Sequence, residues 1–255
     1  TGQSGPDVTR AFHKFVRDSM ANNVPYDQFV RTILTATGDA RSVPAANWFA
    51  QVSTPITQAE DVAQLFLGLR IQCAHCHHHP FEKWTQDDYF GLTAFFTRMK
   101  RTQFKIGKNQ NDQRRMTITF EAGVAQSLNP RTKQNIKPTP LDGEPLELTN
   151  DQDPRTALAS WMTSPENPFF ARALVNRYWK HFFGRGIVEP EDDMRVTNPP
   201  SNPALLDALE ASFKQSKFDM KALVRTICQS TTYQLDSVPN EYNADDTQNY
   251  ARYYA

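Results

Sequence analysis

Residues 73–80 read Cys-Ala-His-Cys-His-His-His-Pro. On a helical turn, residues three apart lie on the same face, so the sulfur atoms of Cys73 and Cys76 are predicted to point in one direction. The Cys-x-x-Cys-His pattern is the attachment signature of c-type haem, in which each sulfur bonds one vinyl group. His77 would direct a ring nitrogen to the iron as its proximal ligand. The pattern predicts one covalent haem c, with its iron, on this segment.

Two other interpretations of the same stretch stay open. Two thiolates with neighbouring imidazoles also suit zinc, which accepts mixed Cys and His ligands. A structural zinc site commonly takes a second pair of ligands from elsewhere, and the distant candidates here are His13, His181 and Cys228. The two cysteines could also form a reduced or redox-active dithiol. Haem c is the interpretation that the sequence favours.

Aromatic residues follow the motif at short distance. Phe81 and Trp84 are candidate haem contacts, because either ring could stack on a haem edge. Core packing is the commoner role for aromatic residues in such positions. Cys228 lies in an apolar segment and is expected to be a buried thiol.

The second axial ligand of the iron has few candidates. Outside residues 75–79, only His13 and His181 could supply another imidazole. His181 ends an aromatic helix that is expected to pack in the core, and a buried His needs partners for its ring nitrogens. We therefore take His181 as the candidate distal ligand. The alternative is a His at the helix C-terminus, where its positive charge is favourable.

Three arginines flank that helix, namely Arg172, Arg177 and Arg185. One of them could bind a haem propionate through two parallel hydrogen bonds. Ion pairing with the acidic turn at residues 189–193 is the favoured interpretation.

Helical periodicity dominates the chain on both sides of the motif. Capping residues and apolar spacing predict helices at 7–20, 27–38, 57–72, 85–96, 154–163, 168–183, 202–216 and 219–230. The Thr57-x-x-Glu60 pattern is expected to form a capping box, and its helix is expected to lead directly into Cys73. Residues 39–55 are predicted to be loop.

Residues 100–153 differ in composition, being polar and rich in Pro, Asn and Lys. Alternation at Met116–Phe120 predicts a strand, paired with Gln103–Ile106 across a turn. We therefore predict a mainly α fold with a small β insertion. The expected segments are a helical part with the haem motif at 1–99, a β and loop insertion at 100–153, and a second helical part at 154–255.

An ordinary small cytochrome c usually carries its haem motif near the N-terminus and a Met ligand well downstream. Here 72 residues precede the motif, and no downstream Met stands in an obvious ligand loop. We therefore expect a c-type haem protein that does not have the ordinary small cytochrome c fold.

Bulk composition limits the partners. The chain has 255 residues with 28 basic and 28 acidic side chains, so its zero net charge gives no electrostatic reason to expect nucleic acid. No stretch approaches the roughly 18 apolar residues of a membrane span. Haem c is attached outside the cytoplasm, which predicts a periplasmic or extracellular protein. Because this attachment takes place on the exported side of the membrane, a secretion signal is expected upstream of Thr1.

Longer stretches resemble a known family. Residues 64–77 read Gln-Leu-Phe-Leu-Gly-Leu-Arg-Ile-Gln-Cys-Ala-His-Cys-His, followed by His-Pro-Phe-Glu-Lys-Trp at 79–84. Residues 167–172 read Asn-Pro-Phe-Phe-Ala-Arg, and residues 176–186 read Asn-Arg-Tyr-Trp-Lys-His-Phe-Phe-Gly-Arg-Gly. These resemble the planctomycete-type cytochrome-associated proteins, in which a PSCyt-type domain precedes a PSD-type domain, both of unknown function.

The resemblance runs from about residue 10 to 235, with a looser fit across 100–150. It implies haem c, export and further chain on both sides, but it names no substrate. We expect an exported mono-haem cytochrome that transfers electrons to a redox partner protein, with assembly into a homo-oligomer or larger complex left open. The alternatives are a haem enzyme acting on peroxide or an exported polysaccharide, and a structural haem protein. Two protein ligands to iron favour electron transfer, whereas an open distal position favours catalysis.

Overall fold

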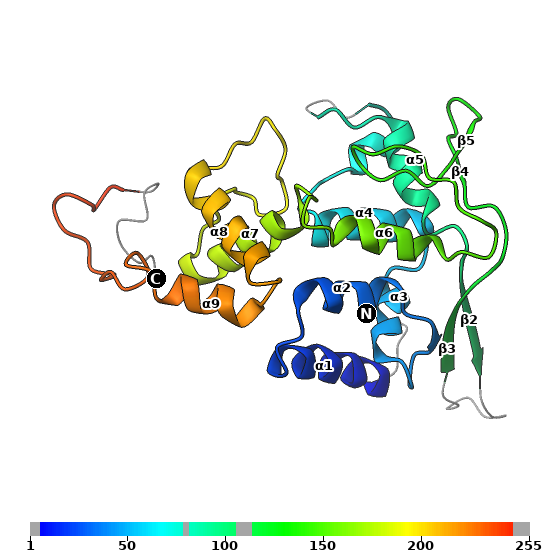
Figure 1. Cartoon of the computed structure of the whole chain (residues 1–255), viewed down its shortest axis with the longest axis horizontal. Helices are drawn as coiled ribbons and strands as arrows, with labels where there is room; N and C mark the ends of the chain where they lie inside the picture. Colours follow the sequence, from blue (N-terminus) through cyan, green and yellow to red (C-terminus); the bar gives the residue numbers. More distant parts are fainter. Residues whose placement is uncertain (1–5, 79–81, 106–113, 247–255) are drawn as a thin grey trace. The chain divides into compact units, whose positions relative to one another are not determined.

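The computed structural model describes residues 6–78, 82–105 and 114–246 (Figure 1). Within this part of the chain there are nine α-helices, two short 3-10 helices and five strands. The predicted mainly helical fold with small sheets is therefore confirmed. Contacts divide the chain into two compact units, one of residues 1–62 and 71–164 and the other of residues 63–70 and 165–255. The division into three segments stays a prediction, because it was drawn from composition rather than from contacts.

The first unit contains most of the helices. They are α1 (Pro6–Ala21), α2 (Tyr26–Leu34), η1 (Pro44–Asn47), α3 (Trp48–Gln51), the first two turns of α4 (Pro55–Phe66), η2 (Gln72–His75), α5 (Gln86–Ala94) and α6 (Pro154–Met162). In its core, the guanidinium of Arg155 is 1% exposed. It pairs with Asp153 at 2.6 Å, donates to Ala36 O at 3.1 Å and lies 5.3 Å from the Phe49 ring centroid. A buried cation therefore joins α6, α3 and the end of α2, with its charge paired as burial requires.

Three predicted features at the N-terminal side are wrong. The predicted loop at 39–55 contains β1 (Gly38–Asp39), η1 and α3, because the buried Asn47 amide donates to Ala40 O at 2.8 Å and to Pro44 O at 2.9 Å. Helix α2 ends at Leu34 rather than at Gly38, which has φ 116° and belongs to β1. Helix α4 ends at Phe66 and does not run into Cys73.

The early end of α4 has a local cause. Gly68 adopts a left-handed conformation with φ 67°, and Leu69 N donates back to Ala63 O at 2.9 Å. This is the glycine-terminated helix end that avoids the Cβ penalty of other residues. A short irregular segment therefore separates the helix from the motif.

The predicted β insertion is confirmed in type and pairing. Strands β2 (Met99–Lys105) and β3 (Arg114–Phe120) are antiparallel, with Gln103 opposite Met116, and β1 pairs with the other side of β3. The remaining predicted residues of the hairpin, at 106–113, lie outside the described part of the chain. A second, two-stranded hairpin is made of β4 (Ser127–Leu128) and β5 (Asn135–Ile136).

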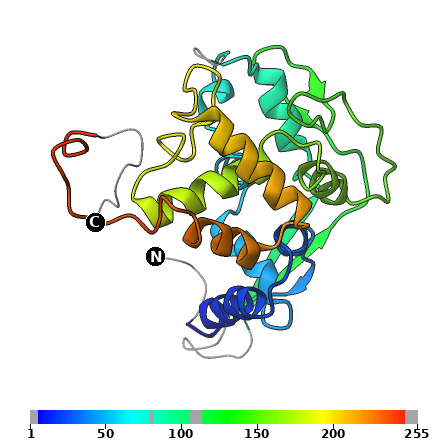
Figure 2. The same ribbon diagram turned by 60° about the vertical axis from the view of Figure 1, so that its left-hand side comes forward.

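The second unit contains α7 (Phe170–Phe183), α8 (Pro203–Gln215) and α9 (Met220–Cys228), which pack against one another (Figure 2). The predicted starts of α8 and α9 are confirmed, because Asn202 accepts from Leu205 N at 3.0 Å and Asp219 accepts from Ala222 N at 2.8 Å. Helix α7 begins at Phe170, two residues after the start predicted at 168. Gly184 ends α7 with φ 72°, as a left-handed C-terminal glycine does.

The loop after α7 is held by a buried asparagine. The Asn176 amide donates to Val188 O at 2.8 Å, and Val188 N donates to Asn176 Oδ1 at 2.9 Å. A Cβ at Gly186 would overlap with Val188 O, so only glycine allows this close approach. The Asn and Gly residues of the stretch at 176–186 therefore have an architectural role.

Candidate functional site

The Cys-x-x-Cys segment forms a 3-10 turn at the surface of the first unit. Both Cys76 N and His77 N approach Cys73 O at 3.3 Å, and η2 covers Gln72–His75. In 3-10 geometry, residues three apart lie directly above one another, which aligns the two cysteines. Both are exposed and form no disulfide, whereas Ala74 between them is fully buried. The turn is therefore anchored by Ala74 and presents two thiols to solvent.

The exposed imidazole of His77 has a defined tautomer. Its Nδ1 lies 2.7 Å from the carbonyl oxygen of His78. A carbonyl only accepts hydrogen bonds, so Nδ1 carries a proton, and in the neutral ring Nε2 is then the nitrogen with the lone pair. A metal-binding His usually donates its other ring N–H in this way, which fixes both tautomer and ring orientation. His77 therefore has the form that an axial ligand requires.

Helices α5 and α4 support the turn from beneath. The His75 ring stacks on Tyr89 with centroids 5.0 Å apart, and Gln86 Nε2 donates to His75 O at 3.0 Å. The buried Tyr89 hydroxyl donates to Glu60 Oε1 at 2.7 Å. Burial, followed by this hydrogen bond to a carboxylate, raises the pKa of Tyr89 above its ordinary value. Tyr89 therefore stays a neutral donor, which links α4 to the motif through α5.

Glu60 has a different role from the predicted one. The capping box between Thr57 and Glu60 is wrong, because α4 begins two residues earlier, at Pro55. Thr54 caps it instead, with Thr57 N donating to Thr54 Oγ1 at 3.2 Å and Thr54 N donating to Thr57 Oγ1 at 3.1 Å. Glu60 then lies further into the helix, where its carboxylate reaches Tyr89.

The two aromatic haem contacts predicted near the motif differ in what can be said of them. Phe81 lies outside the described residues. Trp84 is 3% exposed, and the Lys83 ammonium lies 5.0 Å from its ring centroid. Core packing therefore accounts for most of the Trp84 surface, and haem contact by either residue stays a prediction.

The β4–β5 hairpin packs on α5 beside the motif. Asn129 is fully buried, and its Nδ2 donates to Asp87 Oδ1 on α5 at 2.7 Å. Arg131 follows in the turn and places Nη2 3.3 Å from His78 Nε2. Further along, Thr139 N donates to Gly91 O at 3.1 Å, where a Cβ on the glycine would lie 2.7 Å from Thr139 Cβ. The predicted insertion is therefore packed on the helix that supports the motif.

The predicted burial of His181 is wrong. Helix α7 buries Trp179 and Phe183, which directs the intervening His181 to solvent. Its ring meets Phe182 edge-on, with centroids 5.2 Å apart. His181 lies in the last turn of α7, where a positive charge interacts favourably with the helix dipole. Ligation of iron by His181 stays a prediction.

The predicted pairing of the arginines with the acidic turn is wrong for the two that have described partners. Arg172 pairs with Asp207 and with Glu210 at 2.8 Å, both on the adjacent α8. Arg177 donates to Gln64 O at 3.2 Å. Two other cations pair with the acidic turn instead. Lys180 reaches Glu189 at 2.5 Å and Glu191 at 2.6 Å. Arg70 pairs with Asp192.

Cys228 is half-buried, so the prediction of a buried thiol is only partly met. Within the described ranges, no group of three or more His, Cys, Asp or Glu side chains is gathered as for a metal ion. Attachment of haem by two thiols and one His does not need such a group.

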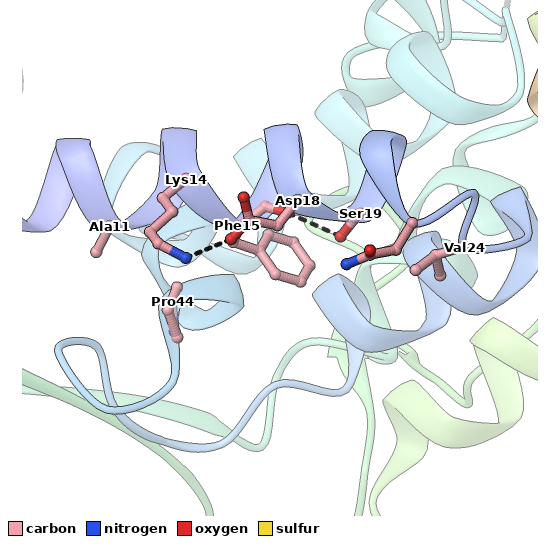
Figure 3. A pocket seen from close by; sticks show the side chains of 8 residues that line it. Ala11, Lys14, Phe15, Asp18, Ser19, Val24 and Pro44 are labelled. Carbon is pink, nitrogen blue, oxygen red and sulfur yellow. Dashed lines mark hydrogen bonds and ion pairs between the residues drawn. The ribbon is translucent and has the colours of Figure 1, made fainter.

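Two cavities lie away from the motif. One of about 300 Å³ runs along α1, where Lys14 pairs with Asp18 and Ser19 donates to Phe15 O at 2.8 Å (Figure 3). Its charged groups therefore neutralise one another. The other, of about 370 Å³, is lined by Asp153, Thr156 and Ser160 beside α6. Neither includes a residue of the Cys-x-x-Cys-His segment.

Comparisons with known proteins give two matches. Residues 3–101 match the family model PSCyt2, a protein of unknown function (DUF1549), and residues 154–255 match PSD1, a protein of unknown function (DUF1553). This is the domain order that the sequence motifs predict. No curated protein and no solved structure matches the chain. None of the helices in the described part of the chain is long and apolar enough to cross a membrane.

Proposed function

The chain belongs to the family in which a PSCyt2 domain is followed by a PSD1 domain, and we propose that it serves there as an exported mono-haem c-type cytochrome in electron transfer. One observation carries the proposal. Two unpaired, exposed thiols lie on the turn that ends at His77, whose Nδ1–H is committed to His78 O at 2.7 Å. This leaves the two sulfur atoms and His77 Nε2 available, and these are the atoms that would hold haem c.

Cys73, Cys76 and His77 would hold the haem. Each thiol would add across one vinyl group, its sulfur to one carbon and its hydrogen to the other, so no oxidant would be consumed. His77 would hold the iron through Nε2, and the His78 carbonyl fixes the orientation of the ring and increases its basicity. The haem, when bound, supplies one-electron chemistry. The stack of His75 on Tyr89 and the hydrogen bond from Gln86 keep the turn rigid beneath it.

Exposure of the attachment residues favours electron transfer as the role. Cys73, Cys76 and His77 are all exposed, so a haem attached to them has an edge near solvent that a partner protein can approach. A haem enzyme instead needs an enclosed site that excludes water from its reactive face. Attachment of haem c outside the cytoplasm adds export to the proposal, which fractionation of the native protein tests directly.

The decisive experiment is maturation in a host that attaches haem c, followed by intact mass spectrometry of the denatured protein. We expect the polypeptide mass plus one haem and a pyridine haemochrome spectrum of the c type. Cys73→Ser and Cys76→Ser should each keep at most one thioether bond. Cys228→Ser is the matched control, since that thiol lies outside the motif and should leave attachment unchanged.

A wild-type mass equal to that of the bare polypeptide would refute the proposal. Metal analysis of the same sample then separates the two alternatives, because a zinc site retains one Zn²⁺ and a dithiol retains none. For the haem protein, reversible reduction without peroxide turnover supports electron transfer, whereas peroxide turnover supports a haem enzyme.

A further inference from the structure

Arg131 is a cation held beside the motif. It lies in the turn of the β4–β5 hairpin, and its Nη2 is 3.3 Å from Nε2 of His78, the residue after the proposed axial ligand. A guanidinium is always charged and donates only, so the unprotonated ring nitrogen of His78 accepts this hydrogen bond. Within the described ranges Arg131 makes no ion pair, so its positive charge is not neutralised there.

The backbone of the exposed Arg131 is held by partly buried contacts. The carbonyl oxygen of the Asn129 side chain accepts from Arg131 N at 2.9 Å and from Thr132 N at 3.3 Å. The amide nitrogen of the same side chain donates to Asp87 on α5 at 2.7 Å. The Asn129 side chain is fully buried, so its end of each of these hydrogen bonds is shielded from water. The turn is therefore fastened to the helix whose Gln86 side chain also holds the motif.

Haem has two chemically different edges. Its vinyl groups and its two propionates lie on opposite sides of the porphyrin. With Cys73 and Cys76 holding the vinyl edge, the carboxylates would lie on the side of the porphyrin away from the two cysteines. A guanidinium matches a carboxylate with two parallel hydrogen bonds, stronger than those between neutral groups.

We propose that Arg131 binds a haem propionate, so that the β4–β5 hairpin is the anionic end of the cofactor site. This inference rests on the proposed haem attachment. It assigns the role to a residue in the insertion, instead of to the arginines around α7. Because a positive charge near the cofactor favours the reduced iron, which carries one positive charge less, Arg131 should also raise the reduction potential.

The test is spectroelectrochemistry of the matured protein, with resonance Raman spectra of the propionate bending modes. Arg131→Gln should shift a propionate mode and reduce the ratio of reduced to oxidised haem at fixed potential by up to tenfold, about 59 mV for one electron. Arg131→Lys keeps the positive charge but loses the two parallel N–H donors. Its reduction potential should therefore be close to that of the wild type, whereas its propionate mode should lie between those of the wild type and Arg131→Gln. The control is Lys133→Asn, which removes a charge in the same turn and suits its left-handed φ of 61°.

Failure of this inference is distinguishable from failure of haem attachment. If wild-type protein carries covalent haem, and Arg131→Gln matches Lys133→Asn in both potential and Raman modes, Arg131 does not bind a propionate. If wild-type protein carries no covalent haem by mass, both proposals fall. If Arg131→Gln does not fold, an Arg131→Lys variant with unchanged Raman modes overturns the inference.

Discussion

Replacement of Asn176 by Ala should strongly destabilise the second unit. The Asn176 side chain makes hydrogen bonds of 2.8 and 2.9 Å to the backbone C=O and N–H of Val188, which is 3% exposed. Each buried backbone group left without a partner costs about 1–3 kcal/mol. Two such groups therefore reduce the free energy of unfolding by about 2–6 kcal/mol. Partial hydration of a relaxed loop would move the value toward the lower end.

Urea denaturation followed by circular dichroism measures this loss, and native-state hydrogen exchange at the Val188 amide reports it locally. Gln215→Ala is the control, because this exposed residue of α8 should change stability by less than about 0.5 kcal/mol. An Asn176→Ala variant that matches this control and keeps the Val188 amide protected would refute the reasoning.

Two further predictions concern the support of the motif and the response to pH. Tyr89→Phe removes the hydrogen bond to Glu60 while keeping the ring under His75, so the free energy of unfolding should fall by about 1.5–3 kcal/mol in urea denaturation. An unchanged denaturation midpoint would contradict this. Phe90→Leu is the control for loss of ring contacts. The second unit should lose stability as pH falls below the ordinary carboxyl pKa values of 3.8 to 4.5. The hydrogen bond from Lys180 lowers the pKa of Glu191. Burial raises the pKa of Asp192, but hydrogen bonds from Arg70 and Gln64 outweigh it and lower this pKa overall. The folded state then binds fewer protons than the unfolded chain, so its advantage is present above this range and lost below it. Lys180→Met should flatten the acid limb of a pH series of thermal melts, and an identical limb would exclude the pairing as its cause.

Helix positions were predictable because their signals are local. Asn202 and Asp219 cap α8 and α9 through hydrogen bonds to backbone only three residues away, and Gly184 ends α7 by its own conformation. The end of α4 was missed although Gly68 marks it, because a Gly within an apolar run does not reveal a positive φ.

The motif itself was predictable from spacing, but its surroundings were not. Asn129 and Arg131 lie more than 40 residues from their partners Asp87 and His78, and no periodicity connects such pairs. The spacing of Glu60 from Thr57 suggested a capping box, but Thr54 caps the helix instead. No sequence pattern indicated the contact between Glu60 and Tyr89. His181 was expected in the core because its neighbours are aromatic, yet the helical rotation between Trp179 and Phe183 directs it outward.

The exposure of both thiols on a packed turn has a consequence for their reactivity. Cys73 and Cys76 are accessible while Ala74 and Tyr89 beneath them are packed, so a reagent can reach both sulfur atoms without opening the core. The same accessibility leaves them open to oxidation, because susceptibility of a thiol follows its exposure. Two thiols aligned on one turn are therefore a pair that an oxidant can reach together.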